Sequence, residues 1–438
     1  MGNASLKIFR AEILHFLDDP AITGEAKSYQ YFPDGILIVK NGHVDAVGDF
    51  LDLLPSLPAR TEVVDYRDSL ILPGFVDCHV HYPQTEMVAA YGEQLLEWLE
   101  NYTFPTERAF SDANKARQVA DFFLDELLRN GTTTALTIPT VHKQSVDAFF
   151  TAAHTRRMRM ICGKVLMDRN APAYLVDTPE TGYHESKALI EHWHGKGRLR
   201  YAITPRFAPT SSDEQLTRAG QLLREHPGVY MHSHLAENLE EVQWVKELFP
   251  QCSGYLDVYD HFGLLGKHTI FAHCLHLNDK EFAVLHKTGS GIAFCPTSNL
   301  FLGSGLFNLS KAQSKCVNVG FGTDIGAGTS FSLLQTINEA YKTQQLRGHQ
   351  LSPLKSFYLA TLGGARTLDL DSAIGNFESG KEADFVVLDY RSTPLSALRI
   401  EGCSRLADKL FVLAILGDDR AVKATYILGQ EAYRRGNI

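Results

Sequence analysis

Short apolar runs alternate with longer amphipathic stretches through most of this sequence, from about residue 70 to residue 325. The apolar runs are rich in aliphatic and β-branched residues, as strands are, and they cover residues 71–79, 132–139, 158–167, 199–207, 229–235, 269–274, 291–295 and 317–323. Helical patterns lie between them, for example over residues 111–129, 212–226, 238–248 and 279–286. Because strand–helix alternation repeated eight times is typical of a (β/α)8 TIM-like barrel, we predict an α/β fold with a closed barrel of parallel strands.

Both ends of the chain carry strand patterns of a different kind. Residues 35–48 contain two alternating runs joined through Asn41-Gly42, a strong signal for a β-hairpin turn, and residues 383–389 and 421–428 resemble further strands. At 438 residues the chain is long enough for one large domain and a smaller one. We therefore expect residues 1–69 and 371–438 to form a small β-sandwich beside a catalytic barrel of residues 70–370.

Polar side chains with metal-binding or acid–base chemistry end several of the predicted strands. His79 and His81 close the run at 73–81, and residues two apart in a strand point to the same face. Later runs end with His234, with His273 and with Asp324. Any one of them alone is more readily explained as a capping or hydrogen-bonded core residue. A barrel gathers the carboxyl ends of its first and last strands at one site, whereas the alternative, a doubly wound open sheet, does not.

Three imidazoles and one carboxylate form a ligand set for a divalent metal. His79, His81, His234 and Asp324 are the predicted ligands, and zinc is the expected ion, although iron, cobalt and manganese accept the same donors. Two-metal enzymes on this scaffold often carry a modified lysine at the end of strand four, and residues 199–207 contain none. Lys164 lies inside the third strand, where a structural role is expected. The sequence therefore predicts one zinc ion per chain.

The same residues predict hydrolysis by activated water. Zinc with an open position lowers the pKa of water towards neutrality, and Asp324 is placed to take the proton as the water attacks. Glu237 follows His234 by three residues and is the predicted general acid, since a dry pocket raises a carboxyl pKa. His273 is expected to hydrogen-bond the water or the developing alkoxide.

Bulk properties exclude several other classes of protein. A net charge of −9 argues against a nucleic-acid-binding surface, and the sequence has no membrane-span or signal-peptide pattern. The seven cysteines are scattered with no Cys-x-x-Cys pair, which suits a reducing compartment, so a cytoplasmic location is expected. The cytidine-deaminase type of zinc site needs His-x-Glu with Pro-Cys-x-x-Cys, and neither motif occurs.

Nearly the whole chain resembles the amidohydrolase superfamily and, within it, the guanine deaminases. The general motifs are PGFVDCHVH at 73–81, His234-x-x-Glu237, His273, Gly322-Thr323-Asp324 and GKEADFVVLD at 380–389. The narrower motifs are HYPQTEMVAAYGEQLLEWLENYTFPTE at 81–107, APTSS at 208–212 and FCPTSNLFLGSGLFNL at 294–309.

The resemblance implies zinc-dependent deamination of guanine, a purine pocket and a homodimer. Gln84 would match a purine edge, Arg206 would hold the ring carbonyl oxygen, and Phe207 would contact the ring. His81, Trp98 and Leu99 complete the implied substrate-binding set, the last two from residues 82–108, which form either a lid or a packed interface segment. Arg206 paired to a barrel carboxylate and Phe207 in the core are the structural alternatives. Two other functions stay open: a zinc aminohydrolase or chlorohydrolase acting on cytosine, a nucleoside or an s-triazine, and a non-catalytic scaffold.

Overall fold

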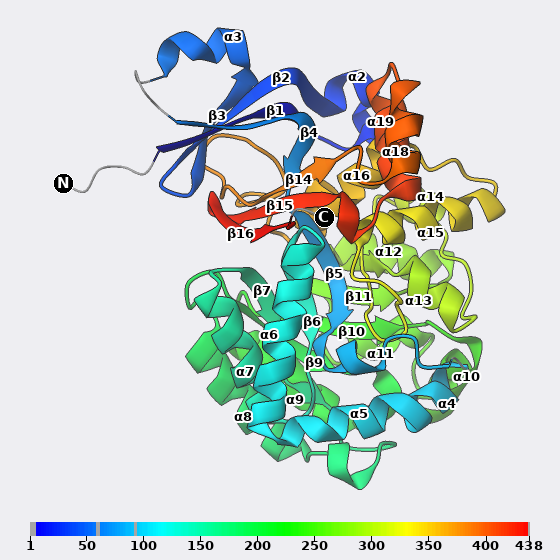
Figure 1. The fold of residues 1–438 in the computed structure, drawn as a ribbon. Helices are drawn as coiled ribbons and strands as arrows, with labels where there is room; N and C mark the ends of the chain where they lie inside the picture. The colour runs from blue at the N-terminus through cyan, green and yellow to red at the C-terminus, as the bar shows by residue number, and fades with distance from the viewer. Residues whose placement is uncertain (1–5, 58–61, 92–93, 437–438) are drawn as a thin grey trace.

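The molecule consists of a barrel of parallel strands and a separate β-sheet (Figure 1). The computed structural model describes residues 6–57, 62–91 and 94–436; Gly92 and Glu93 of the quoted 81–107 motif therefore lie outside the described residues. The barrel strands follow one another in the order β5, β6, β7, β9, β10, β11, β12 and β13, all parallel, with the short β8 paired to β9. Asp324 N donates to His79 O at 2.9 Å and so joins the ends of the last and first strands. The predicted barrel is confirmed.

The barrel strands and the helices around them have the following bounds. The strands are β5 (Phe75–His81), β6 (Thr132–Ile138), β7 (Arg159–Cys162), β8 (Val165–Leu166), β9 (Arg200–Pro205), β10 (Tyr230–Leu235), β11 (Thr269–His273), β12 (Gly291–Phe294) and β13 (Val319–Phe321). The helices are α4 (Leu95–Trp98), α5 (Phe104–Arg108), α6 (Ala113–Arg129), α7 (Lys143–Thr155), α8 (Pro179–Trp193), α9 (Asp213–Glu225), α10 (Leu239–Leu248), α11 (Tyr255–His261), α12 (Asp279–Thr288), α13 (Pro296–Phe301), α14 (Leu309–Ser314), α15 (Leu333–Leu346), α16 (Pro353–Tyr358) and α17 (Gly364–Thr367).

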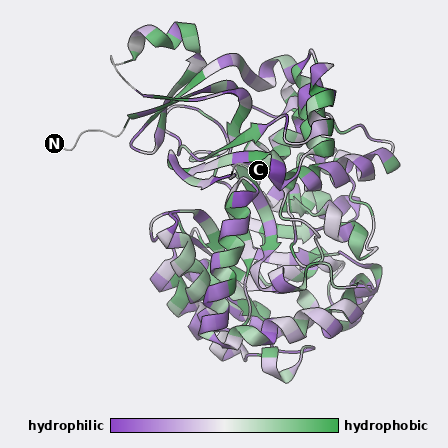
Figure 2. Ribbon diagram, in the orientation of Figure 1, coloured by the Kyte–Doolittle hydropathy of each residue, from purple (hydrophilic) through white to green (hydrophobic). Residues whose placement is uncertain are grey.

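Helix α6 illustrates how the sequence forms these elements. Asp112 caps its first turn by accepting a hydrogen bond from Asn114 N, and Val119, Phe123 and Leu127 recur every fourth residue on the buried face. In Figure 2 the helices around the barrel carry both hydrophobic and hydrophilic residues, as expected of elements with one face in the core. Among the described residues, no helix combines the length and the apolar character needed to cross a membrane.

Strands from both ends of the chain form the second sheet, in the order β16-β15-β14-β4-β1-β2-β3. Its strands are β1 (Leu6–Phe16), β2 (Tyr29–Lys40), β3 (His43–Asp49), β4 (Val63–Pro73), β14 (Phe385–Asp389), β15 (Val422–Ile427) and β16 (Gln430–Arg434). All neighbours are antiparallel except β1 and β4. The predicted hairpin joins β2 to β3 through Asn41 and Gly42, whose φ angles of 55° and 85° suit a tight hairpin turn. Short helices α1 (Pro20–Thr23), α2 (Glu25–Ser28) and α3 (Phe50–Leu53) lie between these strands in the chain.

Two predicted strands are divided by glycines. The run at 71–79 spans the end of β4 and the start of β5, because the chain passes at Gly74 from the terminal sheet into the barrel. A Cβ at Gly74 would lie 2.1 Å from the Thr133 hydroxyl oxygen, so only glycine fits there. Gly163 separates β7 from β8, where a Cβ would lie 1.7 Å from Ala202 O. Residues 70–73 thus belong to the sheet, and we propose that the barrel domain begins at Gly74.

The C-terminal segment is more than a set of strands. Helices α18 (Pro394–Glu401) and α19 (Leu406–Leu416) separate β14 from β15, and Phe411 of α19 packs edge-on against Tyr341 of α15 at 5.0 Å between ring centroids. Buried ion pairs also join the two parts of the molecule. Arg159 pairs with Glu382, and Arg198 pairs with Asp384, each joining a barrel residue to the segment before β14.

Candidate active site

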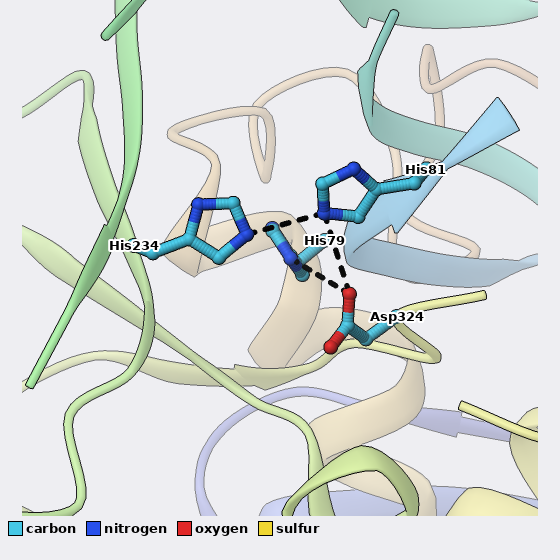
Figure 3. A group of neighbouring side chains, drawn as sticks. All are labelled: His79, His81, His234 and Asp324. Atoms are coloured by element: carbon cyan, nitrogen blue, oxygen red, sulfur yellow. Dashed lines mark hydrogen bonds and ion pairs between the residues drawn. The ribbon is translucent and has the colours of Figure 1, made fainter. Parts of the chain in front are cut away.

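The four predicted metal ligands lie together at the carboxyl end of the barrel (Figure 3). His79 and His81 project from β5, His234 from β10, and Asp324 follows β13. Asp324 Oδ1 lies 3.0 Å from His79 Nε2 and 3.4 Å from His81 Nε2, and the Nε2 atoms of His81 and His234 are 3.1 Å apart. One ligand atom from each residue lies within 4.8 Å of the others, an arrangement that could hold a metal ion.

The outer nitrogens of two of these rings are held by neighbours that orient them. His234 Nδ1 donates to Arg206 O at 2.7 Å, which leaves Nε2 facing the cluster. His79 Nδ1 lies 2.8 Å from His232 Nε2, again leaving Nε2 inward. Such outer contacts are usual for histidines that bind metals. His232 is a residue that the sequence analysis did not single out, although it stands two positions before His234 on the same strand face.

Protonation and hydrogen bonding both fit a metal site. Burial lowers the pKa of His81 and His234 well below the usual value, and it lowers the pKa of His79 in the same way. The neutral imidazoles that result are the metal-binding form. Among the described residues, His79 Nε2 is buried without a hydrogen-bond partner, although a carboxylate oxygen lies 3.0 Å away. A histidine nitrogen and a carboxylate oxygen at this separation are placed as ligands of a common ion would be.

Glu237 and His273 stand beside this cluster. Glu237 lies in the loop between β10 and α10, before the helix begins. Its Oε2 atom is 3.4 Å from His273 Nε2, and its Oε1 atom accepts a hydrogen bond of 3.4 Å from Ser304 Oγ. Burial raises the pKa of Glu237 well above the usual value, and the nearby carboxylates of Asp324 and Glu241 raise it further. Glu237 is therefore held in its neutral acid form to higher pH than an exposed glutamate.

His273 is oriented by a residue that the sequence analysis missed. Its Nδ1 atom donates to Asn299 Oδ1 at 2.9 Å, so Nε2 faces Glu237 and Asp324, with Asp324 Oδ2 3.8 Å away. His273, Cys295 and Asp324 form a second group close enough to hold a metal. Burial raises the pKa of the Cys295 thiol well above its usual value, which disfavours the thiolate that a metal binds.

A pocket opens onto these groups. Its walls contain every residue predicted to bind substrate and every predicted acid–base residue, together with three of the four predicted ligands: Gln84, Arg206, Phe207, His81, Trp98, Leu99, Glu237, His273, His234 and Asp324. Leu95, Leu302, Ala327 and Glu241 complete it. Glu241 holds the loop, because its carboxylate accepts hydrogen bonds from Glu237 N at 2.8 Å and from Tyr255 OH at 2.6 Å.

Residues 94–108 are packed over the pocket. They form α4, a π-helical turn η3 (Leu99–Thr103) and α5, and the side chains of Trp98, Leu99 and Phe104 are buried in one apolar cluster with Phe207. From α5, Glu107 reaches the end of β9. Its carboxylate accepts hydrogen bonds from Arg206 Nη1 at 2.8 and 2.9 Å and from Gln84 Nε2 at 3.2 Å. Arg206 therefore lines the pocket and also pairs with a carboxylate, and Glu107 is a further residue that the sequence analysis did not single out.

Comparison with known proteins gives a consistent picture. A sequence model of the amidohydrolase family matches residues 70–432. The chain is 56% identical to the guanine deaminase of Escherichia coli (strain K12) over 437 residues, which cover 99% of each protein. The solved structure of E. coli guanine deaminase superposes with a TM-score of 0.95 at 55% identity, covering 99% of this chain and 100% of that one. A guanine deaminase from C. acetobutylicum with guanine bound in its active site has a TM-score of 0.88 at 31% identity, covering 98% and 100% of the two chains.

Proposed function

This chain belongs to the amidohydrolase family, and we propose that it catalyses the hydrolytic deamination of guanine to xanthine and ammonia, a step of purine catabolism. The observation that carries the proposal is identity of 56% to a guanine deaminase along 99% of the chain. The pocket supports it as well, because the acid–base residues, three of the four predicted ligands and the polar groups suited to a purine line one cavity.

We propose that His79, His81, His234 and Asp324 hold one zinc ion per chain. The neutral imidazoles and the single carboxylate suit a divalent ion of borderline softness. Such an ion supplies the Lewis acidity that makes water nucleophilic at neutral pH. The absence of a lysine from β9 supports a single ion, since a bridging lysine is expected in a two-metal site.

Two carboxyl groups divide the proton transfers between them. Asp324 takes the proton of the attacking water, because its carboxylate lies at the ligand cluster and opens onto the pocket. Glu237, kept neutral by burial, donates a proton to the ring nitrogen beside the attacked carbon. His273, oriented by Asn299, hydrogen-bonds the oxygen that attacks and stabilises the charge that develops on it. Asp324 then passes its proton to the amine nitrogen, and the Glu237 carboxylate takes back a proton from the new hydroxyl group. Ammonia leaves from the tetrahedral carbon as the second carbonyl of xanthine forms.

The remaining lining residues bind and orient the purine. Arg206 donates to the ring carbonyl oxygen, and Gln84 matches the adjacent edge of the ring. Phe207 contacts the ring face, and His81 approaches it from the metal side. Trp98 and Leu99 cover the pocket and exclude water, which strengthens the polar contacts inside.

The test is ammonia release from guanine, adenine, cytosine and ammeline, with metal content measured on the same preparation. We expect guanine to be deaminated far faster than the others. Adenine carries an amine where guanine has its carbonyl, so the donors of Arg206 would face another donor. Because this leaves buried polar groups without a partner, we expect a large preference for guanine over adenine. Preference for cytosine or ammeline would show that the assigned substrate is wrong, whereas the assignment as a hydrolase would stand. Release from none of them, with no bound metal, would favour a non-catalytic scaffold.

We further propose a homodimer that acts in the cytoplasm, on the strength of the family resemblance and the scattered free cysteines. Light scattering of the purified chain measures the first property, and fractionation of cells measures the second.

A further inference from the structure

Glu107 lies behind the pocket and contacts it only through other residues. Its side chain is fully buried, and in the part of the chain that the structure describes its carboxylate bonds only to Arg206 and Gln84. Both partners line the pocket, whereas Glu107 does not. A single buried charge thus stands between two polar residues that come from different strand ends.

Stability alone does not explain this buried charge. Removing two charges from water costs about as much as their attraction returns, and apolar residues of similar volume are often at least as stable in the same place. The neighbourhood could accept apolar side chains, since Phe104 from the same helix packs its ring 5.6 Å from Arg206 Cζ. A function in the pocket that two apolar side chains could not perform therefore explains the ion pair better than stability does.

The carboxylate fixes which atoms of its partners remain for a ligand. A carboxylate only accepts hydrogen bonds, so the amide nitrogen of Gln84 faces Glu107 and the amide oxygen faces away. That oxygen lies against the backbone of Gly326, where a Cβ would be 2.0 Å from it. Arg206 uses Nη1 for Glu107, and its Nε and Nη2 atoms have no hydrogen-bond partner among the described residues. A ligand therefore meets donors from Arg206 and an acceptor from Gln84.

We propose that Glu107 is a positioning residue that sets this order of donors and acceptor, and that it thereby makes the pocket select rings in which a carbonyl stands beside a ring N–H. Guanine presents that pair, with the carbonyl facing the arginine and the N–H facing the glutamine oxygen. The inference rests on the proposed function, because it assigns the selectivity of the same pocket.

The experiment compares two ligands that differ in this group. Hypoxanthine has the carbonyl beside the N–H in its six-membered ring, purine has neither group in that ring, and both lack the amine that is removed. Their dissociation constants are measured by calorimetry on the metal-loaded protein, for the wild type and for Glu107→Gln. Glutamine can donate as well as accept, so the Gln84 amide is free to turn and Arg206 loses its anchor. We expect the preference for hypoxanthine over purine to fall by about tenfold or more, while purine binding changes by less than about threefold.

Glu382→Gln is the matched control. Glu382 forms a largely buried ion pair, with Arg159, at the junction of barrel and sheet. The Glu382→Gln variant should have a lower free energy of unfolding but the wild-type preference for hypoxanthine over purine. If Glu107→Gln does not fold, the double variant Glu107→Leu/Arg206→Met removes both charges together and should lose the preference.

Two results would overturn the inference: a wild-type preference in Glu107→Gln or in the double variant, or an equal loss of preference in Glu382→Gln. Failure of the proposed function is distinguishable from these, because it appears as a wild-type protein that releases no ammonia from guanine, whereas the two dissociation constants are measured without turnover.

Discussion

Replacing Glu237 by glutamine separates proton donation from folding and metal binding. A positioned general acid contributes about 10²–10⁴ in rate, so we expect kcat for guanine to fall by about 100-fold or more, which is ~2.7 kcal/mol of transition-state stabilisation at the lower limit. Glu237 is not among the four predicted ligands, and its Oε2 atom lies 3.4 Å from Nε2 of His273, which is not one of them either. Metal content should therefore stay at the wild-type value.

The structure also indicates that this substitution is mild for the fold. Burial raises the pKa of Glu237, so the native carboxyl group stays neutral to higher pH than an exposed glutamate, and glutamine has nearly the same shape and the same charge as that neutral form. Glutamine Oε1 can still accept the hydrogen bond from Ser304 Oγ. We expect the free energy of unfolding to change by less than about 1 kcal/mol, as for a substitution that leaves no buried polar atom newly unpaired.

The assay is steady-state deamination of guanine across pH, with metal measured by mass spectrometry. The acid must be protonated to act, so wild-type kcat/KM should fall as pH rises through the raised pKa of Glu237. That alkaline limb should be absent from Glu237→Gln. Glu240→Gln, at an exposed neighbouring position, is the control and should behave like the wild type. The reasoning is refuted if Glu237→Gln keeps kcat within about tenfold, or if it loses metal while the metal-loaded fraction turns over normally.

Three further substitutions test other parts of the structure. His234→Ala should remove both metal and activity from a protein that binds about one zinc per chain; full metal retention, or a wild-type content near two, would contradict the single-ion site. Arg206→Met should lower kcat/KM for guanine by a factor that corresponds to a loss of about 2–5 kcal/mol of transition-state stabilisation, with unchanged zinc content. A loss below about 1 kcal/mol would show that Arg206 does not recognise the substrate. Arg198→Met should reduce the free energy of unfolding by about 3–5 kcal/mol in denaturant titrations, because it leaves Asp384 buried without its cation. A loss below about 1 kcal/mol would show that water compensates for the missing cation.

The barrel and the ligand cluster could be predicted because both depend on patterns that are local in the sequence. Each predicted ligand ends an apolar run, and the fold brings the ends of parallel strands to one side whatever fills the loops. The spacing of His79 and His81 is enough to predict that both side chains lie on the same face of their strand. The strand limits were harder to predict, because the runs around Gly74 and Gly163 are continuously apolar. The breaks arise from close contacts with Thr133 and Ala202, which only the folded chain brings near.

The residues that position the site could not be predicted in the same way. Glu107 meets Arg206 across 99 positions of sequence, from a segment with no regular periodicity, and an isolated acidic residue there has no distinguishing pattern. Asn299 and His232 act through single hydrogen-bond contacts with predicted residues. Such contacts depend on side-chain orientation, which hydrophobic periodicity does not encode.

The place of β4 in the terminal sheet has a consequence for the order in which a ribosome releases this chain. Strand β4 pairs on one side with β1 and on the other with β14, and it leads through Gly74 directly into β5. A nascent chain that has not reached residue 385 therefore holds β4 with one edge unpaired, although all the barrel strands have already been synthesised. That edge is apolar from Leu70 to Leu72, which makes it a site for wrong pairing between incomplete chains. Synthesis of β14 covers this edge, so the segment from residue 385 onward protects the strand that leads into the barrel.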